Sequence, residues 1–383
     1  MPGNLTIKLM RVLYLHAGNL YGGVESTAVT IARYRHLCPE MEPHFAVCFE
    51  GRLSRELAAT GVSTTILGDV RIRHPWTVRR VRRALRELLR RERFDVVITH
   101  SAWGQALFGP VVKAAGLLLA YWFHEPMRGK HWLERWATLT RPDLALCNSK
   151  FTASSIHNMY PALDTEWLYN PVPPIKQLLS LSERVAIRSE LKTPEAATVI
   201  LQASRMEEWK GHLIHLKALS LLRDIPDWVC WQAGGAQRSH ERKYLEKLKA
   251  TALRLGIAER IYFLGERSDI PKIMAAADIH CQPNSGPEPF GNVFVEALFS
   301  QLPVVTTAMG GAKEIVDDTC GFLVPPDNVQ AIATSLAQLI QKPALRISKG
   351  AAGPARARKL CDPETQLIDL KEKLSSLIKR KIG

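Results

Sequence analysis

The stretch RVLYLHAGNLYGGVES, residues 11–26, contains the pattern that determines the fold class. An apolar run typical of a buried strand ends at Ala17, a loop with three glycines follows, and a helical pattern begins near Val24. Glycines in such a loop let the backbone approach a ligand closely, and the N-terminus of the next helix favours an anion. The loop matches neither the GxGxxG nor the Walker pattern, so a plain turn between strand and helix is the alternative.

The same succession of strand and helix patterns recurs along the chain. Before residue 169, apolar runs typical of strands begin at Arg11, His44, Phe94, Leu117 and Leu144. Helical patterns occupy residues 24–37, 75–91, 104–115 and 150–160. After residue 177, strand patterns begin at Ala197, Trp228, Arg260, Asp278 and Leu302, helices begin at His212, His240, Asp269 and Gly291, and a basic helical tail begins at Ala344. This alternation predicts parallel sheets with helices on both faces.

A proline-rich segment, YNPVPPIKQ at residues 169–177, separates the two series of elements. Its three prolines lie within four residues, which breaks any regular element and suits a linker between domains. A chain of 383 residues is also too long for one ordinary core. The expected fold class is therefore α/β, with two doubly wound, Rossmann-like parallel-sheet domains that face a central cleft. In such sheets, ligands lie beyond the carboxyl ends of the strands.

The overall composition excludes several classes of protein. The chain is 46% hydrophobic and 23% charged, which is typical of globular proteins. No apolar run approaches the roughly 18 residues of a transmembrane helix, and the N-terminus lacks an apolar segment followed by a cleavage site. The seven cysteines are dispersed and form no CxxC pair, which suggests buried thiols in a reducing compartment. The expected location is the cytoplasm.

Basic residues concentrate in one segment of a chain whose net charge is +14. Residues 71–93 (from Arg71 to Arg93) contain ten arginines and two glutamates. Apolar residues recur every three or four positions from Val78 to Leu88, so this segment is expected to be an amphipathic helix with an arginine-rich outer face. An anionic membrane surface is the preferred partner. A nucleic acid is not expected, because no nucleic-acid-binding motif accompanies the arginines.

The stretch SRMEEWKGH, residues 204–212, places two cations beside a predicted helix N-terminus. Arg205 follows a strand and Lys210 lies five residues later. An arginine fork together with a mobile lysine charge suits a diphosphate, although two solvated surface cations would give the same pattern.

The stretch GPEPFGNVFVEALFSQLPVV, residues 286–305, contains two glutamates that lie eight residues apart. Pro289 disfavours helix at Glu288, so a helix is expected to begin near Gly291 and to contain Glu296. The backbone amides of Phe290, Gly291, Asn292 and Val293 would then be free to bind an anion. Two carboxylates beside an anion site make sense if they accept hydrogen bonds from sugar and ribose hydroxyls. A favourable charge in the first turn explains one glutamate but not the other.

Four further residues lie at the ends of predicted strands. Gly310 and Gly311, in TAMGGAKEIV, precede a short helix and could equally form an ordinary turn. His124, in YWFHEP, and His100, in VITHSAW, each end a strand and so are expected near a ligand. A single histidine is more often structural than catalytic, and His100 has the weaker claim.

Taken together, these motifs resemble the retaining glycosyltransferases of family 4, which have the GT-B architecture. The motifs GGVE, SRMEEWKG, FLGERSDIPKIMAAADIHCQP, EPFGNVFVE, VVTTAMGGAKEIV and GFLVPPDN occur in the order that the family shows. The resemblance covers nearly the whole chain. It implies an acceptor-side domain at residues 1–172 and a nucleotide-sugar-binding domain at residues 173–355. It also implies a C-terminal helix at residues 356–383 that crosses back onto the first domain.

The resemblance also implies roles for individual residues. Arg205 and Lys210 would hold the diphosphate, Glu296 the ribose and Glu288 the transferred sugar. His124 would lie near that sugar, and these residues form the expected catalytic set: Glu288, His124, Arg205 and Lys210. Gly22 and Gly23 would close over the sugar donor from the other domain, and the amides at residues 290–293 would complete its site. Glu25 and His100 would lie on the acceptor side. No cofactor or metal is implied.

The function implied by the resemblance is transfer of a sugar from a nucleotide-diphosphate sugar to a saccharide or lipid-linked acceptor. Cell-surface polysaccharide or glycolipid biosynthesis at the inner face of the membrane is the expected setting. The arginine and lysine would stabilise the leaving diphosphate, and the acceptor would attack on the leaving-group face, which retains the anomeric configuration. Three alternatives remain: a non-catalytic nucleotide-sugar-binding protein at the membrane, a sugar-nucleotide epimerase and an RNA-binding protein.

Overall fold

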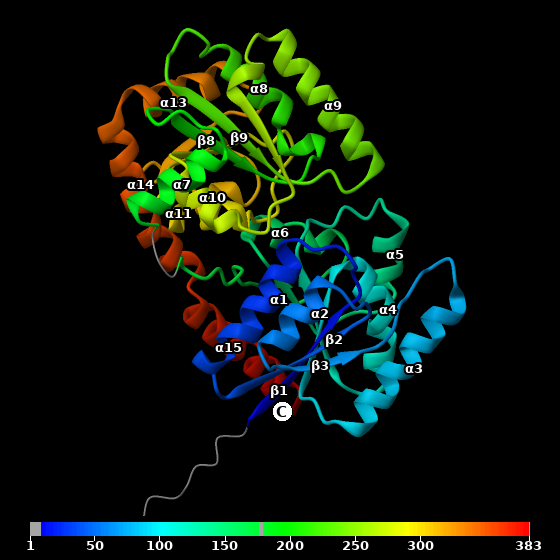
Figure 1. Cartoon of the computed structure of the whole chain (residues 1–383). Coiled ribbons are helices and arrows are strands. Elements are labelled where there is room, and N and C mark those ends of the chain that lie inside the picture. Colours follow the sequence, from blue (N-terminus) through cyan, green and yellow to red (C-terminus); the bar gives the residue numbers. More distant parts are fainter. Residues whose placement is uncertain (1–8, 176–178, 383) are drawn as a thin grey trace, which may run out of the picture. The chain divides into compact units, whose positions relative to one another are not determined.

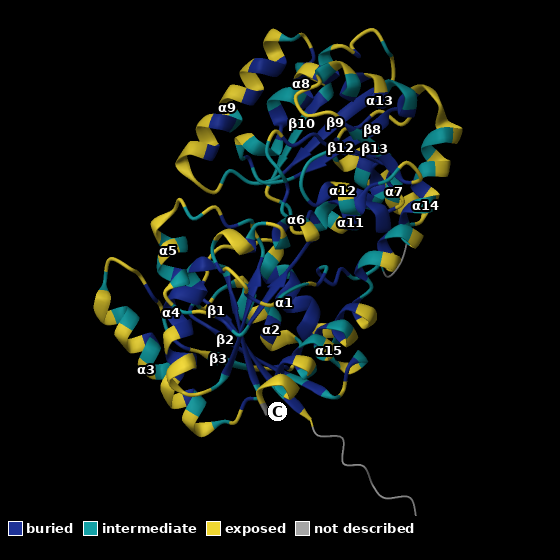
Figure 2. Ribbon diagram, turned by 180° about the vertical axis from the view of Figure 1, so that it is seen from behind, coloured by how far each residue is buried: buried dark blue, intermediate teal, exposed yellow. Residues whose placement is uncertain are grey.

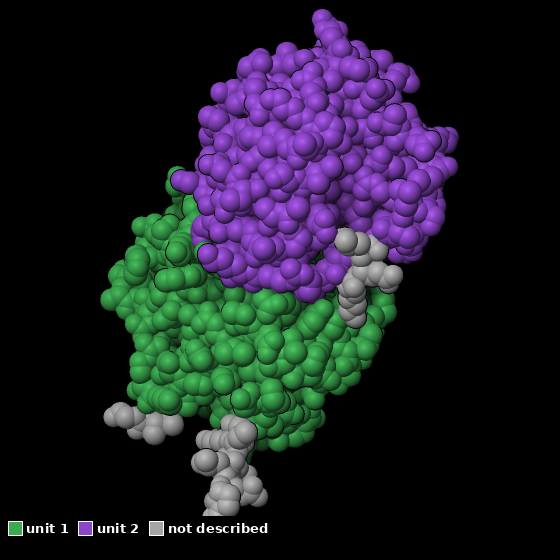
Figure 3. Space-filling model, turned by 90° about the vertical axis from the view of Figure 1, so that its left-hand side faces the viewer, with its two compact units in different colours: residues 1–172, 361–383 green, residues 173–360 purple. Residues whose placement is uncertain are grey.

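The computed structural model describes residues 9–175 and 179–382 and divides into two compact units. Unit 1 comprises residues 1–172 and 361–383, and unit 2 comprises residues 173–360 (Figure 3). The expected domain boundaries followed residues 172 and 355, and the units meet after residues 172 and 360. Residues 176 and 177 of the proline-rich segment lie outside the described residues, as do residues 1–8, on which the expectation of no signal peptide depends.

Unit 1 contains a seven-stranded parallel sheet with the strand order β3-β2-β1-β4-β5-β6-β7. Its strands are β1 (Met10–His16), β2 (Met41–Val47), β3 (Ser63–Ile66), β4 (Val96–His100), β5 (Leu118–Phe123), β6 (Leu144–Cys147) and β7 (Thr165–Trp167). The chain moves outward in one direction from β1 and in the other direction from β4. The carboxyl ends of β1 and β4 therefore flank the point where a ligand binds in sheets of this kind.

Helices cover both faces of this sheet (Figure 1). They are α1 (Gly23–Tyr34), α2 (Arg52–Ala59), α3 (Pro75–Arg91), α4 (Ser101–Ala114), α5 (Trp132–Thr138), α6 (Lys150–Ala153) and α15 (Pro363–Ile382), with 3-10 turns at Arg35–Leu37 and Ile156–Asn158. Alternate residues of β1 enter two cores, because successive strand side chains point to opposite faces. Val12 and Tyr14 pack with α1 and α15, whereas Leu13 and Leu15 pack with α3 and α4.

The C-terminal helix α15 belongs to the core of unit 1. Leu367, Leu370 and Leu374 are buried against the same cluster as α1. Lys373 adds an ion pair to Glu166 at 3.3 Å. The C-terminal helix α15 and the strand β1 therefore belong to the same domain.

Helix α3 has the bounds that the sequence predicts, residues 75–91. Val81, Leu85 and Leu88 are buried, and the arginines on the opposite face are exposed (Figure 2). Trp76, at the start of the helix, is 64% exposed. Among the described residues, no helix combines the length and the apolar character that a bilayer crossing needs.

Unit 2 contains a six-stranded parallel sheet with the order β10-β9-β8-β11-β12-β13. Its strands are β8 (Thr198–Ala203), β9 (Trp228–Ala233), β10 (Ile261–Gly265), β11 (Ile279–Gln282), β12 (Val304–Thr307) and β13 (Gly321–Val324). Its helices are α7 (Leu181–Glu190), α8 (His212–Ser220), α9 (Ser239–Arg254), α10 (Ile270–Ala276), α11 (Asn292–Phe299), α12 (Ala312–Ile315), α13 (Val329–Gln341) and α14 (Pro343–Cys361), with 3-10 turns at Glu208–Lys210 and Ala258–Arg260. The switch in strand order lies between β8 and β11.

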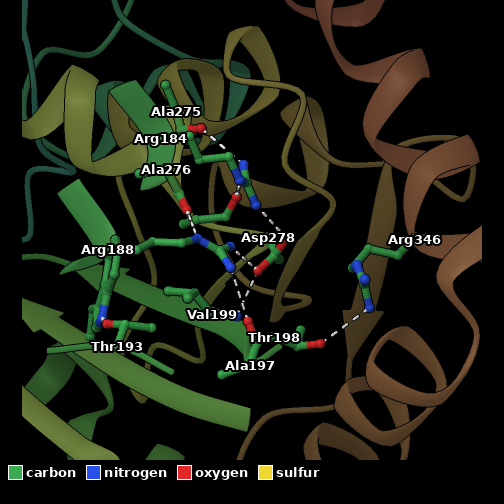
Figure 4. Close-up of polar contacts among 12 residues, drawn as sticks. Arg184, Arg188, Thr193, Ala197, Thr198, Val199, Ala275, Ala276, Asp278 and Arg346 are labelled. Carbon is green, nitrogen blue, oxygen red and sulfur yellow. Dashed lines mark hydrogen bonds and ion pairs between the residues drawn. The ribbon is translucent and has the colours of Figure 1, made fainter. Parts of the chain in front are cut away.

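A cluster of arginines anchors α7 at the amino end of β11 (Figure 4). Arg184 and Arg188 form ion pairs of 2.7 and 2.5 Å with Asp278, and both donate to backbone carbonyls of residues 275–277. Their donors are directed to the protein itself, at the amino end of a strand rather than its carboxyl end. This cluster is therefore structural.

The predicted fold class of two doubly wound α/β domains is confirmed. The sequence missed three short strands, β3, β7 and β13. All seven cysteines are buried and free, as expected.

Candidate functional site

Three loops of unit 2 meet at the switch point of its sheet. They follow β8, β11 and β12, which are neighbours in the sheet and end at the same edge. The first loop contains Arg205 and Lys210, the second contains Glu288, and the third contains Gly310. The fold thus brings together the cations and the glutamate that the sequence predicted for one site.

Two glycines allow the loops to touch through their backbones. Gly211 has φ 75°, and a Cβ there would lie 1.8 Å from the carbonyl oxygen of Pro283. Gly310 has φ 59°, and a Cβ there would lie 2.2 Å from the carbonyl oxygen of Glu288. The amide of Gly311 donates to that same Glu288 oxygen at 2.7 Å. Contacts this close exclude any side chain, so Gly310 fixes the backbone at Glu288 and Gly211 fixes it at Pro283.

The central contact of the site is an ion pair between Lys210 and Glu288. The lysine Nζ lies 2.7 Å from Glu288 Oε2, and the two side chains are only 14% and 10% exposed. Asn284 donates to the same oxygen at 2.9 Å and Gln282 at 3.4 Å. The lysine ammonium also lies 3.9 Å from the ring centroid of Trp209. Glu288 is therefore held as an acceptor by several donors, in surroundings with little water.

Arg205 provides a more accessible charge at the same edge. Its side chain is 38% exposed and forms an ion pair of 2.8 Å with Glu207. A surface pair of this kind contributes little stability, so the guanidinium can be redirected to an incoming anion at low cost. Arg205 and Lys210 thus combine one accessible cation with one that is mostly shielded from solvent.

Glu296 lies on the second turn of α11 and is partly buried. Burial raises its pKa to about 7. Among the residues that the structure describes, none donates a hydrogen bond to its carboxylate. A carboxylate that is desolvated and has no protein donor can accept hydrogen bonds from a ligand that brings hydroxyls.

Helix α11 begins one residue later than predicted. It starts at Asn292, and Gly291 is its N-cap with φ 106°, a conformation that favours glycine. A Cβ at Gly291 would lie 2.5 Å from the Phe294 ring, so only glycine fits at this position. The Phe290 side chain is buried in the protein interior at 2% exposure. Its contribution to a ligand site would therefore come from its backbone, as would those of Gly291 and Val293.

In unit 1, a second group of predicted residues meets at the carboxyl ends of β1, β4 and β5. The glycine loop precedes α1, and Glu25 in the first turn accepts a hydrogen bond from the Gly22 amide at 2.8 Å. The other oxygen of Glu25 lies 2.7 Å from His16 Nε2, at the end of β1. Burial acts to raise the pKa of Glu25, but His16 and the backbone amides outweigh it, so the pKa is lowered.

The Glu25 carboxylate thus holds the glycine loop in position. In the structure its two oxygens are engaged within unit 1 and the residue is buried. Its expected place on the acceptor side stays a prediction. Gly23, the second glycine of the motif, is the first residue of α1.

The two histidines that the sequence singled out contact each other. His100 Nδ1 and His124 Nε2 are 2.9 Å apart, and their rings stack with centroids 5.1 Å apart. Burial lowers the pKa of His124 to about 3 and that of His100 well below its usual value. Both imidazoles are therefore neutral at pH 7, and one donates to the other.

Sequence reasoning missed several residues of these two groups. His16 ends the strand of the opening motif, and its position at a strand end was the available signal. Gln282 and Asn284 flank the proline of IHCQPN, where nothing in the local pattern distinguishes them from loop residues. The prediction that no metal is needed stays untested; within residues 9–175 and 179–382, no group of His, Cys, Asp or Glu is arranged to hold one.

Comparison with known families matches both units. The family described as glycosyl transferases group 1 matches residues 183–355, and the family described as glycosyltransferase family 4 matches residues 21–175. The human alpha-1,3/1,6-mannosyltransferase ALG2 is 29% identical over 249 residues, which are 61% of this chain and 58% of that protein. The phosphatidyl-myo-inositol mannosyltransferase of Mycobacterium leprae is 37% identical over 107 residues, 27% of this chain and 29% of that protein.

The chain spans about half the length of the curated relatives it matches, or less. Among solved structures, Anabaena HepE in complex with UDP-glucose has a TM-score of 0.84 and 26% sequence identity. That likeness covers 96% of this chain and 100% of the other. The two-domain fold of unit 1 and unit 2 is thus shared along nearly the whole chain.

Proposed function

Because this chain belongs to the family 4 and group 1 glycosyltransferases, we propose that it transfers a sugar from a nucleotide-diphosphate sugar to a saccharide or lipid-linked acceptor. The observation that carries the proposal is the buried Lys210–Glu288 pair at the switch point of unit 2. Anabaena HepE is described in complex with UDP-glucose, which supports the same class of sugar donor. The names of the curated relatives support a lipid or saccharide acceptor.

The charges of unit 2 suit the departure of a nucleotide diphosphate. Arg205 would turn from Glu207 toward the diphosphate, and Lys210 would meet the charge that develops on the leaving phosphate. When Lys210 engages the phosphate, Glu288 Oε2 loses its ion-pair partner and can accept from hydroxyls of the transferred sugar. Glu296 would accept from the ribose hydroxyls, and the amides at the start of α11 would complete the site.

We propose retention of the anomeric configuration, with attack of the acceptor hydroxyl on the face from which the diphosphate leaves. The bond between the anomeric carbon and the phosphate oxygen breaks, the acceptor oxygen bonds to that carbon as its O–H bond breaks, and the proton passes to the departing phosphate. His124 is neutral and is held at Nε2 by His100, so it would serve as a hydrogen-bond partner of the sugar rather than as an acid. Gly22 and Gly23 would approach the sugar donor closely. No metal or cofactor is needed for these steps.

Thermal unfolding with UDP, GDP and ADP tests the sugar-donor site. A nucleotide at about 100 times its Kd adds roughly 2.7 kcal/mol to the folded state, so one nucleotide should raise the Tm clearly. Lys210→Ala should abolish that rise. Lys217→Ala, an exposed lysine on α8, should retain it. Absence of stabilisation by all three nucleotides, or an unchanged response of Lys210→Ala, would contradict the proposal.

We further propose that the outer face of α3 binds an anionic membrane surface from the cytoplasmic side. The exposed arginines and the exposed Trp76 support this role, since indoles and cations suit the headgroup region.

Vesicle flotation tests the membrane proposal. Replacing Arg79, Arg86 and Arg90 by Gln should weaken binding to vesicles of anionic phosphatidylglycerol by about 100-fold, since each cation contributes about 1 kcal/mol. Replacing Arg242, Lys243 and Lys247 on α9 removes the same charge and should have little effect. An equal loss of vesicle binding in both variants would show that net charge, and not the face of α3, causes the binding. Failure of the wild type to float with the vesicles would overturn the membrane proposal.

A further inference from the structure

Three tryptophans of unit 1 form a continuous row that the roles above do not use. Trp103 and Trp136 have ring centroids 5.9 Å apart, and Trp136 and Trp132 have centroids 6.3 Å apart with nearly parallel planes. His131 extends the row, with its ring 5.6 Å from that of Trp132. We call Trp103, Trp136 and Trp132 the tryptophan row.

One end of the tryptophan row lies on the helix that directly follows His100. Trp103 lies in the first turn of α4, three residues after His100, and the intervening Ser101 has φ 63°, which is uncommon for a residue with a side chain. Trp136 and Trp132 belong to α5, which packs against α4 and follows the loop that starts at His124. The row therefore starts at the carboxyl edge of β4 and β5 and continues along the outer surface of α5.

The outer end of the row is open to solvent. Trp132 is 53% exposed, and Trp136 and Trp103 are partly exposed. Within the part of the chain that the structure describes, the three indole N–H groups have no hydrogen-bond acceptor, and none of them is fully buried. In unit 2, by contrast, the indoles of Trp228 and Trp231 donate to Leu222 and Thr193 at 2.9 and 3.0 Å.

Indole rings with accessible N–H groups suit a saccharide. The apolar face of a pyranose ring can lie against an indole, and a hydroxyl can accept from the indole nitrogen. Arg128, Lys130 and Arg135 are exposed around α5, as is Glu125 next to His124. Cations and a carboxylate together offer hydrogen bonds to hydroxyls. The face of α3, where arginines far outnumber acids, instead suits an anionic bilayer.

We propose that the tryptophan row is a subsite for the saccharide part of the acceptor, which it binds over more than one sugar ring. The proposal rests on the proposed transferase function and names a part of its acceptor site. The row leads from the edge that carries His100 and His124 outward, so the reacting end of the saccharide lies near the histidines and the remaining rings lie on Trp136 and Trp132.

Calorimetric titration with neutral sugars tests the subsite without a known acceptor. The probes are methyl α-mannoside, α-linked mannotriose and maltotriose, each added to the full chain. At least one trisaccharide should bind more tightly than the monosaccharide. Trp132→Ala should weaken that binding at least tenfold, and Trp132→Phe should stay within about threefold of the wild type. Trp167→Ala removes a tryptophan on β7 of unit 1 that is 47% exposed, and this matched control should bind normally.

Three outcomes would overturn the subsite. They are no binding of either trisaccharide, unchanged binding by Trp132→Ala, and an equal loss in Trp167→Ala. Loss of binding to phosphatidylglycerol vesicles in Trp132→Ala, with saccharide binding unchanged, would assign the row to the membrane instead. The nucleotide-induced rise in Tm separates the two proposals. If the wild type and Trp132→Ala both retain it, the sugar-donor site stands and only the subsite fails; if the wild type lacks it, the proposed function fails.

Discussion

The two sheets share one topology, yet their carboxyl edges differ in charge. The edge of unit 2 carries the charged residues Arg205, Lys210 and Glu288, and beside them Glu296 has a pKa raised to about 7. The edge of unit 1 carries imidazoles, and burial keeps His100 and His124 neutral at pH 7. One architecture thus offers a charged site on one sheet and a largely neutral one on the other.

The two edges therefore suit different ligands. Under the proposed function, Arg205 and Lys210 of unit 2 would meet the negative charge of a diphosphate. The neutral histidine pair of unit 1 would offer hydrogen bonds to a sugar or a neutral acceptor without competing charge. The Glu25 carboxylate, whose charge acts on His124, is engaged by His16 and by the Gly22 amide.

The largest effect is expected for the charged edge. Lys210→Ala and Glu288→Gln should each lower kcat by about 10² to 10⁴, because each removes a group that meets charge or hydroxyls in the transition state. The double variant should lose more than either single variant, because in the transition state Lys210 meets the phosphate and Glu288 meets the sugar hydroxyls. Steady-state kinetics measure this, with circular dichroism as the control for folding. A double variant no slower than the single variants would show that the two side chains act as one unit.

The next largest effect, on the free energy of unfolding, is expected for the glycines that let the loops of unit 2 touch. Gly211→Ala should destabilise the fold by at least about 3 kcal/mol, because its Cβ would overlap the Pro283 carbonyl oxygen. Gly256→Ala is the matched control: its φ is 69°, and a Cβ there meets nothing within 4 Å. That control should cost only about 1–2 kcal/mol. Urea unfolding of both variants gives the comparison, and equal costs would mean that the close approach is not needed.

A smaller effect on stability is expected at Glu296, with a size that depends on pH. The pKa of Glu296 is raised from 4.5 to about 7, so its ionisation destabilises the folded state as the pH rises from 4.5 to about 7. Glu296→Gln should therefore stabilise the ligand-free protein by about 1–3 kcal/mol at pH 8 and by almost nothing at pH 4.5. The same change should weaken nucleotide binding. A gain in stability at pH 4.5 equal to that at pH 8 would rule out ionisation as its source.

The smallest effect is expected at Glu25 on the neutral edge. Its pKa is lowered, so its stabilising contribution is present at pH 7 and is lost as the pH falls through its folded-state pKa. Glu25→Gln should cost about 1 kcal/mol at pH 7, and the difference from the wild type should shrink toward pH 4. Chemical unfolding across that range tests this. A cost that does not vary with pH would mean that the charge of Glu25 is unimportant.

Much of the fold follows from local pattern. Helix α3 has its predicted bounds, because apolar residues at helical spacing face a core and proline begins the first turn. The buried strands were predicted for the same reason. The missed strands β3 and β7 are short and only partly buried, so they lack the long apolar run that identifies a central strand. They exist because a neighbouring strand offers them backbone hydrogen bonds.

Periodicity and the order of motifs along the sequence are enough to predict two Rossmann-like domains and to assign an Arg/Lys loop and a Glu-x7-Glu loop to one site. The folded structure adds the contacts of Lys210 with Glu288, of His100 with His124 and of Trp103 with Trp136. Each of these contacts joins residues that follow different strands of one sheet or that lie on different helices. The distances between these residues depend on strand order and on the glycines that let backbones approach each other. Neither feature can be predicted from the spacing of residues along the chain.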